Sequence, residues 1–151
     1  MLIMLYHFIG HKIGDIQKDM RSRAIKNTKF DPWNDPGNIM IQAILGYLTK
    51  LETNYENYGV IVYFKKGFVI IGALLYSIND NKCTIHRLGV TKEYRRQNIG
   101  TKMVEFLELY LKIVNVKEIS LYSSDELYTI KFYKKLGFEI VYSTNMIKHL
   151  K

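Results

Sequence analysis

The sequence predicts an α+β fold in which a mixed, mostly antiparallel and twisted sheet of about six or seven strands is flanked by about four helices. Three observations support this prediction. Residues 59–90 contain three strand-like runs separated by short turns, which predicts consecutive antiparallel strands. Residues 83–122 read strand, amphipathic helix, strand, and such a link is parallel and right-handed. Residues 139–150 close the chain as a hairpin. A parallel step beside antiparallel strands predicts a central splay.

The N-terminal third is expected to hold one strand and two helices. Residues 2–9 are rich in Leu, Ile, Tyr and Phe and predict a strand. Residues 13–26 and 39–51 place apolar side chains at helical spacing. Between them, residues 28–38 contain both prolines and the only tryptophan, which is typical of a loop.

The middle of the chain is expected to form a hairpin, a third strand and a helix. Residues 59–64 and 68–78 flank a Lys-Lys-Gly turn, and residues 83–90 follow a second turn at residues 79–82. Gly72 lies inside the second strand, where a glycine indicates a bulge or a close approach. The helix at residues 102–114 has one apolar face, so it is expected to pack on the core.

A last helix is predicted before the closing hairpin. Ser123 and Glu126 have the spacing of a capping box, which predicts the start of a helix. The helix is expected to end at Gly137, with Phe138 as a hydrophobic closing contact. The end of the helix is sufficient to explain why Gly137 and Phe138 occur in the sequence. It does not explain Tyr133.

Composition limits the class of protein. A chain of 151 residues suits a single domain, taken as residues 1–151. The net charge of +8 is compatible with a polyanionic ligand, with nucleic acid or with a soluble basic surface. With one cysteine the chain has no internal disulfide and no Cys-rich metal site, so a reducing, cytoplasmic setting is expected. No run of about 20 apolar residues could span a membrane, and no metal site is predicted.

The stretch from Val90 to Thr101 joins a strand to a helix and carries no acid after Glu93. The start of a helix presents free backbone N–H groups that attract phosphate. Two arginines stand side by side here, at 95 and 96, and the planar guanidinium suits phosphate. Without a second signal, this stretch is equally well interpreted as a solvated turn.

Two motifs supply that signal. The run Arg95-Arg96-Gln97-Asn98-Ile99-Gly100 resembles the pyrophosphate loop of the GCN5-related N-acetyltransferases, and Leu88-Gly89-Val90 fits the strand that enters it. The run from Phe132 to Phe138 resembles a second motif of the same family. The two motifs come in the order found in the family. Together with the flanking strands, the likeness covers residues 59–150. Asn98 replaces a loop glycine, and asparagine tolerates a left-handed backbone well. Glu126 replaces an asparagine that often contacts the cofactor, which puts that contact in doubt.

The resemblance implies transfer of an acetyl group from acetyl-coenzyme A, as co-substrate, to a primary amine. It implies that the Val90 N–H polarises the thioester and that Tyr133 protonates the departing thiolate. We expect His86 on the same strand face as Leu88 and Val90, as a candidate base. The alternatives are a water chain and a structural histidine. The cofactor-binding residues implied are Leu88, Gly89, Val90, Arg95, Arg96, Gln97, Asn98, Ile99, Gly100, Thr101 and Tyr133.

Other functions stay open at this point. The same fold could bind an acyl-coenzyme A or a partner without transfer. A basic nucleic-acid-binding domain would require a basic stripe or aromatics set among lysines and arginines, which the sequence does not favour. The acceptor could be a small molecule or an amine of a peptide or protein. By analogy with the family, Trp33, Asp31 and Asp35 are candidates to contact it, although a packed surface loop explains them too.

Overall fold

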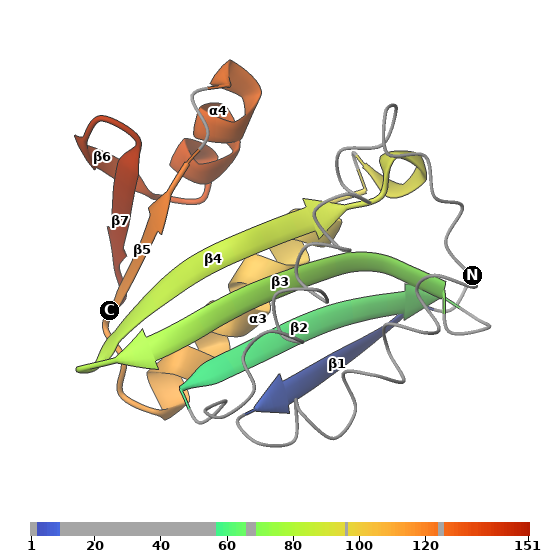
Figure 1. The fold of residues 1–151 in the computed structure, drawn as a ribbon, viewed down its shortest axis with the longest axis horizontal. Helices are drawn as coiled ribbons and strands as arrows, with labels where there is room; N and C mark the ends of the chain where they lie inside the picture. The colour runs from blue at the N-terminus through green and yellow to red at the C-terminus, as the bar shows by residue number, and fades with distance from the viewer. Residues whose placement is uncertain (1–2, 10–56, 66–68, 96, 124–125) are drawn as a thin grey trace.

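The computed structural model describes residues 3–9, 57–65, 69–95, 97–123 and 126–151 (Figure 1). Its strands form one seven-stranded sheet with the order β1-β2-β3-β4-β5-β7-β6. The elements are β1 Ile3–Ile9, β2 Tyr58–Lys65, β3 Val69–Asn79, β4 Lys82–Val90, the 3-10 helix η1 Lys92–Tyr94, α3 Ile99–Ile113, β5 Glu118–Tyr122, α4 Leu127–Lys135, β6 Glu139–Tyr142 and β7 Asn145–His149. The predicted strand count is therefore confirmed.

The described part of the chain contains two α-helices instead of the predicted four. The two expected at residues 13–26 and 39–51, and the loop at 28–38 with its candidate acceptor contacts, lie outside the described residues. Neither α3 nor α4 is long and apolar enough to cross a membrane.

Strands β1 to β4 are antiparallel to their neighbours, β5 is parallel to β4, and β5, β7 and β6 are again antiparallel. This confirms the predicted hairpins and the predicted parallel step. The turn between β3 and β4 places Asp80 and Asn81 at φ 51° and 61°. A two-residue turn of this kind requires positive φ at both central positions, which aspartate and asparagine tolerate. The twist of the turn then matches that of the flanking strands.

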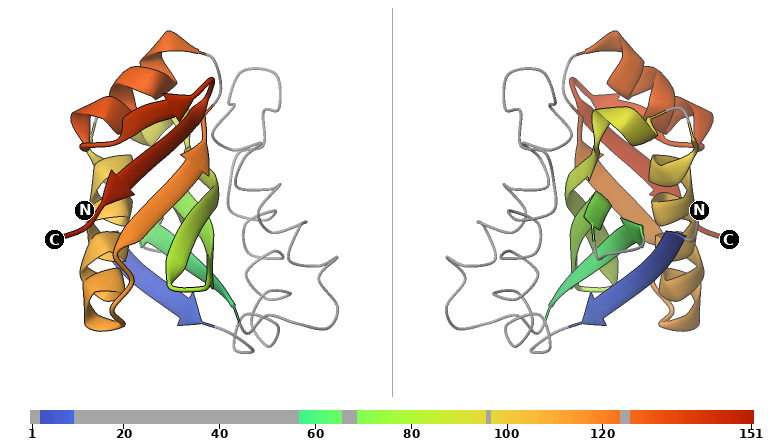
Figure 2. Two further views of the ribbon diagram at one scale, coloured as in Figure 1. Left: turned by 90° about the vertical axis from the view of Figure 1, so that its left-hand side faces the viewer. Right: turned by 90° about the vertical axis from the view of Figure 1, so that its right-hand side faces the viewer.

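Helix α3 covers one face of the sheet (Figure 2). Its apolar side chains are buried together with residues of β2 to β5 and β7; from the helix these are Ile99, Met103, Val104, Leu107 and Leu111. Gly72 lies at the point of closest approach, since a Cβ there would be 3.1 Å from Cγ2 of Ile99 and 3.2 Å from Cε of Met103. The pairing register of β2 and β3 also shifts beside Gly72. The expected bulge and close approach are both found.

His7 of β1 and Tyr76 of β3 form a polar pair at the β1 side of the same core. Nε2 of His7 lies 2.6 Å from the hydroxyl of Tyr76, which is 1% exposed. The His7 ring also meets Phe106 and Tyr110 edge-on, at centroid distances of 5.3 and 4.6 Å. A Cβ at Gly59 would overlap the Tyr76 phenol, so only glycine leaves room for that ring. The pair connects β1 to β3 across β2.

The start of α4 differs from the prediction. The helix begins at Leu127, and Glu126 is the N-cap residue, with an extended backbone and no side-chain capping bond. Ser123 is buried, and its N–H donates to the carbonyl of Thr144 in the turn between β6 and β7. Because that bond holds Ser123 beside the hairpin, the chain is not yet helical there. The predicted capping box is wrong.

Candidate active site

The central feature of the sheet is a splay between β4 and β5 (Figure 1). The two strands pair over only three positions, from Cys83 opposite Ile119 to Ile85 opposite Leu121. Strand β4 then continues to Val90 while β5 ends at Tyr122. A bulge lies at the point of divergence, because Leu75 and Tyr76 of β3 oppose Arg87 and Ile85, which leaves His86 as the extra residue. A bulge bends the strand that carries it, and this explains the divergence.

The backbone of Leu88 and Val90 is directed into the splay. Val90 opposes Gly72 of β3, and the next N–H, that of Thr91, donates to the carbonyl of Ile71 at 2.9 Å. Hydrogen-bonded and non-hydrogen-bonded pairs alternate along antiparallel strands. Val90 and Leu88 are thus non-hydrogen-bonded toward β3, and their N–H and C=O groups point toward the β5 side. An extended ligand could hydrogen-bond to these backbone groups in the way that a neighbouring strand does.

The loop after β4 ends in a left-handed residue at the start of α3. Asn98 has φ 61° and ψ 22°, and its carbonyl accepts the first helical bond, from the N–H of Lys102 at 2.9 Å. The expectation that asparagine can keep this loop conformation is confirmed. The helix begins at Ile99, three residues earlier than predicted, so Ile99, Gly100 and Thr101 form its first turn. Their N–H groups precede that first bond and are directed out of the helix end.

The charge around this helix start favours an anion. The first turn of α3 contains no acidic residue. Arg95 is exposed, and its Nε lies 3.4 Å from the carbonyl of Val90. Gln97 is exposed, and its amide donates to the carbonyl of Glu93 at 3.4 Å. Arg96 lies outside the described residues. Helix dipole and guanidinium together form a site suited to phosphate.

Tyr133 lies at the end of α4, inside the core. The N–H of Phe138 donates to the Tyr133 carbonyl and that of Gly137 to the Lys134 carbonyl, both at 3.0 Å, and Gly137 has φ 97°. This is a Schellman ending, in which a hydrophobic contact closes the helix. Here the Tyr133 and Phe138 rings meet at a centroid distance of 5.4 Å. The predicted helix end is confirmed, and it also accounts for the Tyr133 ring.

The phenol of Tyr133 is protonated at neutral pH. The side chain is 7% exposed, and burial raises its pKa to about 12. The neighbouring Phe132 approaches the start of α3, since a Cβ on Gly100 would lie 3.1 Å from its Cζ. Because Gly100 has no side chain, α4 can pack closely on the first turn of α3, where the proposed phosphate site lies. The second motif and the loop are brought together, as the resemblance implies.

His86 does not lie on the face that strict alternation predicts. Leu88 and Val90 pack against the core on the α3 side. His86 instead contacts Ser77, with 2.7 Å between Nε2 and Oγ, and its ring lies 5.7 Å from that of Tyr58. The bulge adds one residue at 86 and so reverses the alternation. Burial, and next the charge of Arg87, lower the pKa of His86, so the imidazole is neutral at pH 7.

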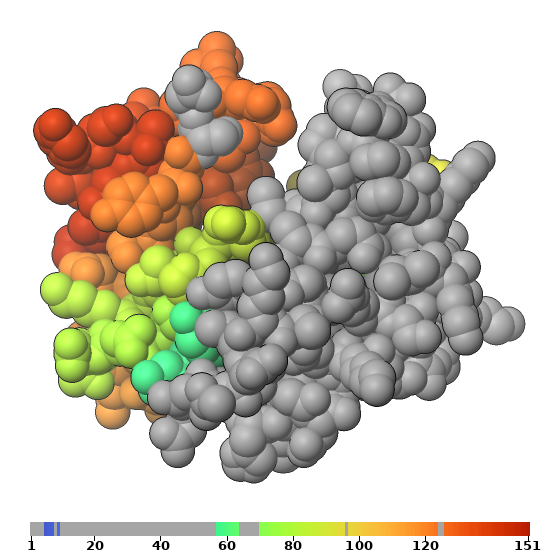
Figure 3. Space-filling model, viewed as in Figure 1, coloured from blue at the N-terminus to red at the C-terminus, as the bar shows by residue number. Residues whose placement is uncertain are grey.

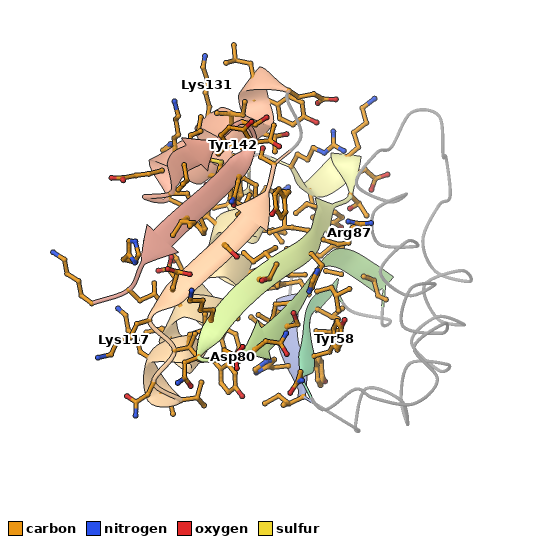
Figure 4. The ribbon with its side chains drawn as sticks, turned by 60° about the vertical axis from the view of Figure 1, so that its left-hand side comes forward. Tyr58, Asp80, Arg87, Lys117, Lys131 and Tyr142 are labelled. Atoms are coloured by element: carbon orange, nitrogen blue, oxygen red, sulfur yellow. The ribbon has the colours of Figure 1, made fainter. Side chains whose placement is uncertain are left out.

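The sheet face turned away from α3, here called the second face, carries polar groups that sequence reasoning missed. Ser77 is 3% exposed and holds His86, and Thr84 Oγ1 lies 3.3 Å from Ser120 Oγ across the last paired stretch of β4 and β5. Figure 4 labels Tyr58 of β2 and Arg87 of β4, the chain neighbour of His86. Only strand pairing brings these residues together, and no local sequence pattern marks them.

Comparison with known proteins identifies the family. The family model described as "Acetyltransferase (GNAT) family" matches residues 22–138. The chain belongs to this family. No curated protein sequence matches this chain. Among the described residues, no cluster of three His, Cys, Asp or Glu side chains could hold a metal ion.

Solved structures of the same fold cover nearly the whole chain. The PaiA N-acetyltransferase of Thermoplasma acidophilum, in complex with coenzyme A, is 18% identical with a TM-score of 0.66, over 100% of this chain and 99% of that one. A GNAT acetyltransferase of Staphylococcus aureus Mu50 is 16% identical with a TM-score of 0.69, over 99% and 100%. The ribosomal-protein-S18-alanine N-acetyltransferase of Escherichia coli is 15% identical with a TM-score of 0.66, over 99% and 93%. At these identities the likeness establishes the fold.

Proposed function

We propose that this protein transfers an acetyl group from acetyl-coenzyme A to a primary amine, by direct attack in a ternary complex. One observation carries the proposal. The outward-directed backbone of Leu88 and Val90 and the acid-free start of α3 lie at the same end of β4, joined by the loop of residues 91–98. The similar structure from T. acidophilum, which contains coenzyme A, supports the choice of ligand.

The residues present suit the two ends of coenzyme A. The N–H groups of Ile99, Gly100 and Thr101 would bind its diphosphate, with Arg95 and Arg96 supplying positive charge and Gln97 and Asn98 shaping the loop. Leu88, Gly89 and Val90 would bind the extended amide-bearing arm, because the backbone of Leu88 and Val90 offers donors and acceptors along one strand edge. The bound thioester supplies the electrophilic carbonyl carbon.

The chain's own residues then perform three tasks. Val90 donates its N–H to the oxygen on which negative charge develops, which is the usual role of a backbone donor in acyl transfer. Tyr133 is protonated at neutral pH because burial raises its pKa to about 12, so its hydroxyl can donate to the leaving sulfur as negative charge develops there and then regain a proton from solvent. The third task is removal of a proton from the amine, whose pKa in a free lysine-like amine is about 10.4.

His86 is too far from Val90 to accept that proton directly. Four residues of strand separate them, or about 13 Å at about 3.3 Å per residue, whereas a base must lie within about 3 Å of the proton it removes. We therefore propose that water carries the proton to His86. The imidazole is neutral at pH 7 because burial and Arg87 lower its pKa, so it can accept the proton.

A second candidate function is binding of acyl-coenzyme A without transfer. It is favoured by the packing of Tyr133, whose ring completes the Schellman contact with Phe138 and so has a structural role independent of catalysis. The two candidates differ in one measurable respect, because a binding module releases no thiol from acetyl-coenzyme A when amines are added.

The test measures binding and turnover separately. Calorimetry should show that the protein binds coenzyme A, and that Arg95→Ala combined with Arg96→Ala weakens binding about 10-fold or more, through loss of two charge-assisted contacts. Lys112→Ala, at the opposite end of α3, is the matched control. Thiol release from acetyl-coenzyme A is then followed with a panel of amines and peptides. Equal affinity in the double variant rejects the loop assignment, while tight binding with no thiol release favours the binding module.

A further inference from the structure

A row of polar side chains crosses the second face from β2 to β5, and His86 lies against its middle. Tyr58 of β2 directly opposes Ser77 of β3, and Ser77 opposes Thr84 of β4, whose own partner on β5 is Ser120. Directly opposed residues share one face of a sheet. Figure 3 shows this face, on which atoms of β2, β3, β4 and β5 reach the surface.

Two members of this row hold the His86 ring in one position. Oγ of Ser77 lies 2.7 Å from Nε2, and the Tyr58 ring lies at a centroid distance of 5.7 Å, with 31° between the two ring planes. Ser77 is 3% exposed, so water competes little for its hydroxyl and the bond to the ring keeps its strength. Contacts from β2 and β3 together leave the ring little freedom to rotate.

The other ring nitrogen of His86, Nδ1, has different surroundings. In the part of the chain that the structure describes, no residue hydrogen-bonds to Nδ1, and Nδ1 is not one of the buried side-chain atoms without a partner. The side chain as a whole is partly exposed. Water can therefore reach Nδ1, whereas Nε2 is engaged by Ser77.

The position of the ring proton decides whether His86 can act as a base. A neutral imidazole has one N–H and one lone pair. If Ser77 donated to Nε2, the lone pair would be used inside the sheet and the proton would be on Nδ1. If Nε2–H donates to Ser77, the lone pair is on Nδ1, where water can deliver a proton.

The neighbouring cation favours the second assignment. Nη1 of Arg87 donates to the carbonyl oxygen of His86 at 2.9 Å, so the guanidinium lies beside the His86 backbone. Nδ1 is the ring nitrogen closer to that backbone. A positive charge attracts a lone pair and repels the hydrogen of an N–H. Arg87 therefore stabilises the ring form that has its lone pair on Nδ1 and its hydrogen on Nε2.

We propose that Ser77 is a positioning residue, whose Oγ accepts a hydrogen bond from Nε2–H of His86 and so keeps the lone pair of Nδ1 available for the proton of the amine. This inference rests on the proposed acetyl transfer. The amine nitrogen gives one proton to water as its bond to the acetyl carbon forms, and water passes a proton to Nδ1. His86 becomes an imidazolium, whose Nε2–H bond to Ser77 is charge-assisted and stronger. It returns the Nδ1 proton to solvent after the product leaves.

Nuclear magnetic resonance of nitrogen-labelled protein reports the position of the ring proton without any turnover. The histidine side-chain spectrum at pH 7.5 should show a protonated Nε2 and a bare Nδ1 for His86, whose signals are identified by their loss in His86→Ala. In Ser77→Ala the pKa of His86 should fall, because the lost bond stabilises the charged ring more than the neutral one. A bond from the serine O–H to Nε2 would stabilise the neutral ring instead, and its loss would raise the pKa.

The other groups that could affect this titration are the same in both proteins. Among the described residues beside the ring, β2 contributes the phenol of Tyr58, β4 contributes the guanidinium of Arg87, and β3 contributes Ser77, which does not titrate. The direction of the pKa change therefore reports on the Ser77 bond alone.

Turnover then tests whether this positioning matters for catalysis. The acceptor is tyramine or a lysine-free tripeptide amide with a free N-terminus, whichever is acetylated faster. Ser77→Ala should lower kcat about 5-fold, through loss of one hydrogen bond, and leave the KM of acetyl-coenzyme A unchanged. Ser77→Thr keeps the hydroxyl and should restore kcat. Ser120→Ala is the matched control, because it removes a hydroxyl of the same face that contacts Thr84 and not His86, and it should have no effect.

Each outcome decides a different point. A proton on Nδ1 in the wild type, or a His86 pKa that rises in Ser77→Ala, overturns the assignment of the bond. An unchanged kcat in Ser77→Ala, or an equal loss in Ser120→Ala, overturns the positioning role. If the wild type acetylates neither probe, the proposed function fails and the positioning role fails with it, while the resonances still show which nitrogen carries the proton. Thermal melts of each variant separate a loss of fold from a loss of positioning.

Discussion

The buried pair of His7 and Tyr76 makes stability depend on pH in a way that can be worked out from the structure. The ring of His7 is half-buried among Tyr76, Phe106 and Tyr110, and burial lowers its pKa from 6.5 to about 4. In the unfolded chain the pKa returns to about 6.5. Between these values the unfolded state binds more protons than the folded state, so stability is complete above pH 6.5 and is lost as the pH falls toward 4.

The magnitude follows from the size of the pKa change. A difference of this size corresponds to about 3 kcal/mol, at about 1.4 kcal/mol per pH unit. Because solvent reaches part of the ring, screening reduces the expected contribution to about half, or about 1.5 kcal/mol. The substitution His7→Gln keeps a hydrogen-bonding side chain beside the Tyr76 hydroxyl but does not titrate.

Urea unfolding at pH 7.5, 6.5, 5.5 and 4.5 provides the assay, with the wild-type protein and His7→Gln compared at each pH. All other titrating groups are common to both proteins, so the difference between their free energies of unfolding isolates His7. We expect the wild type to lose about 1.5 kcal/mol more than the variant between pH 7.5 and 4.5. A difference that is constant with pH would refute the argument, because it would mean that His7 titrates alike in the folded and unfolded states.

Four further predictions concern the site and its frame. Tyr133→Phe should lower kcat about 100-fold and leave coenzyme A affinity unchanged in calorimetry; unaltered turnover removes the phenol from the mechanism. His86→Ala should remove the acidic limb of the kcat/KM–pH profile, which in the wild type falls below pH 6.5 because the pKa of His86 is lowered; a limb at the same pH would indicate another base. Gly59→Ala should destabilise the fold by about 3 kcal/mol in urea unfolding, through overlap with the Tyr76 phenol, and wild-type stability would contradict that packing. Lys148→Met removes contacts of 2.7 Å to Glu108 and 2.6 Å to the Leu136 carbonyl and should cost about 2 kcal/mol; the matched control Lys82→Met breaks an exposed pair of 3.9 Å and should cost under about 0.5 kcal/mol, so equal losses would refute the distinction.

Local chemistry in the sequence was sufficient to predict most elements in the described part of the chain. Gly137 and Phe138 indicated a helix end, and the backbone there has the bonds that such residues favour. Asn98 indicated a left-handed residue, and its φ of 61° agrees. Residues 83–122 indicated a parallel step, and β4 and β5 pair in that way. These features depend on backbone conformation and hydrophobic period, which neighbouring residues set.

Tertiary structure decided which residues meet. The bulge at His86 arises from pairing with β3, and it reverses the face that counting along β4 predicts. Ser123 and Glu126 have capping-box spacing, yet the bond from Ser123 to Thr144 postpones the helix. Tyr122 and Tyr142 both pair with Asn145 only because β7 lies between β5 and β6. Contacts between distant residues depend on register and strand order, and the free energy of the whole sheet sets both.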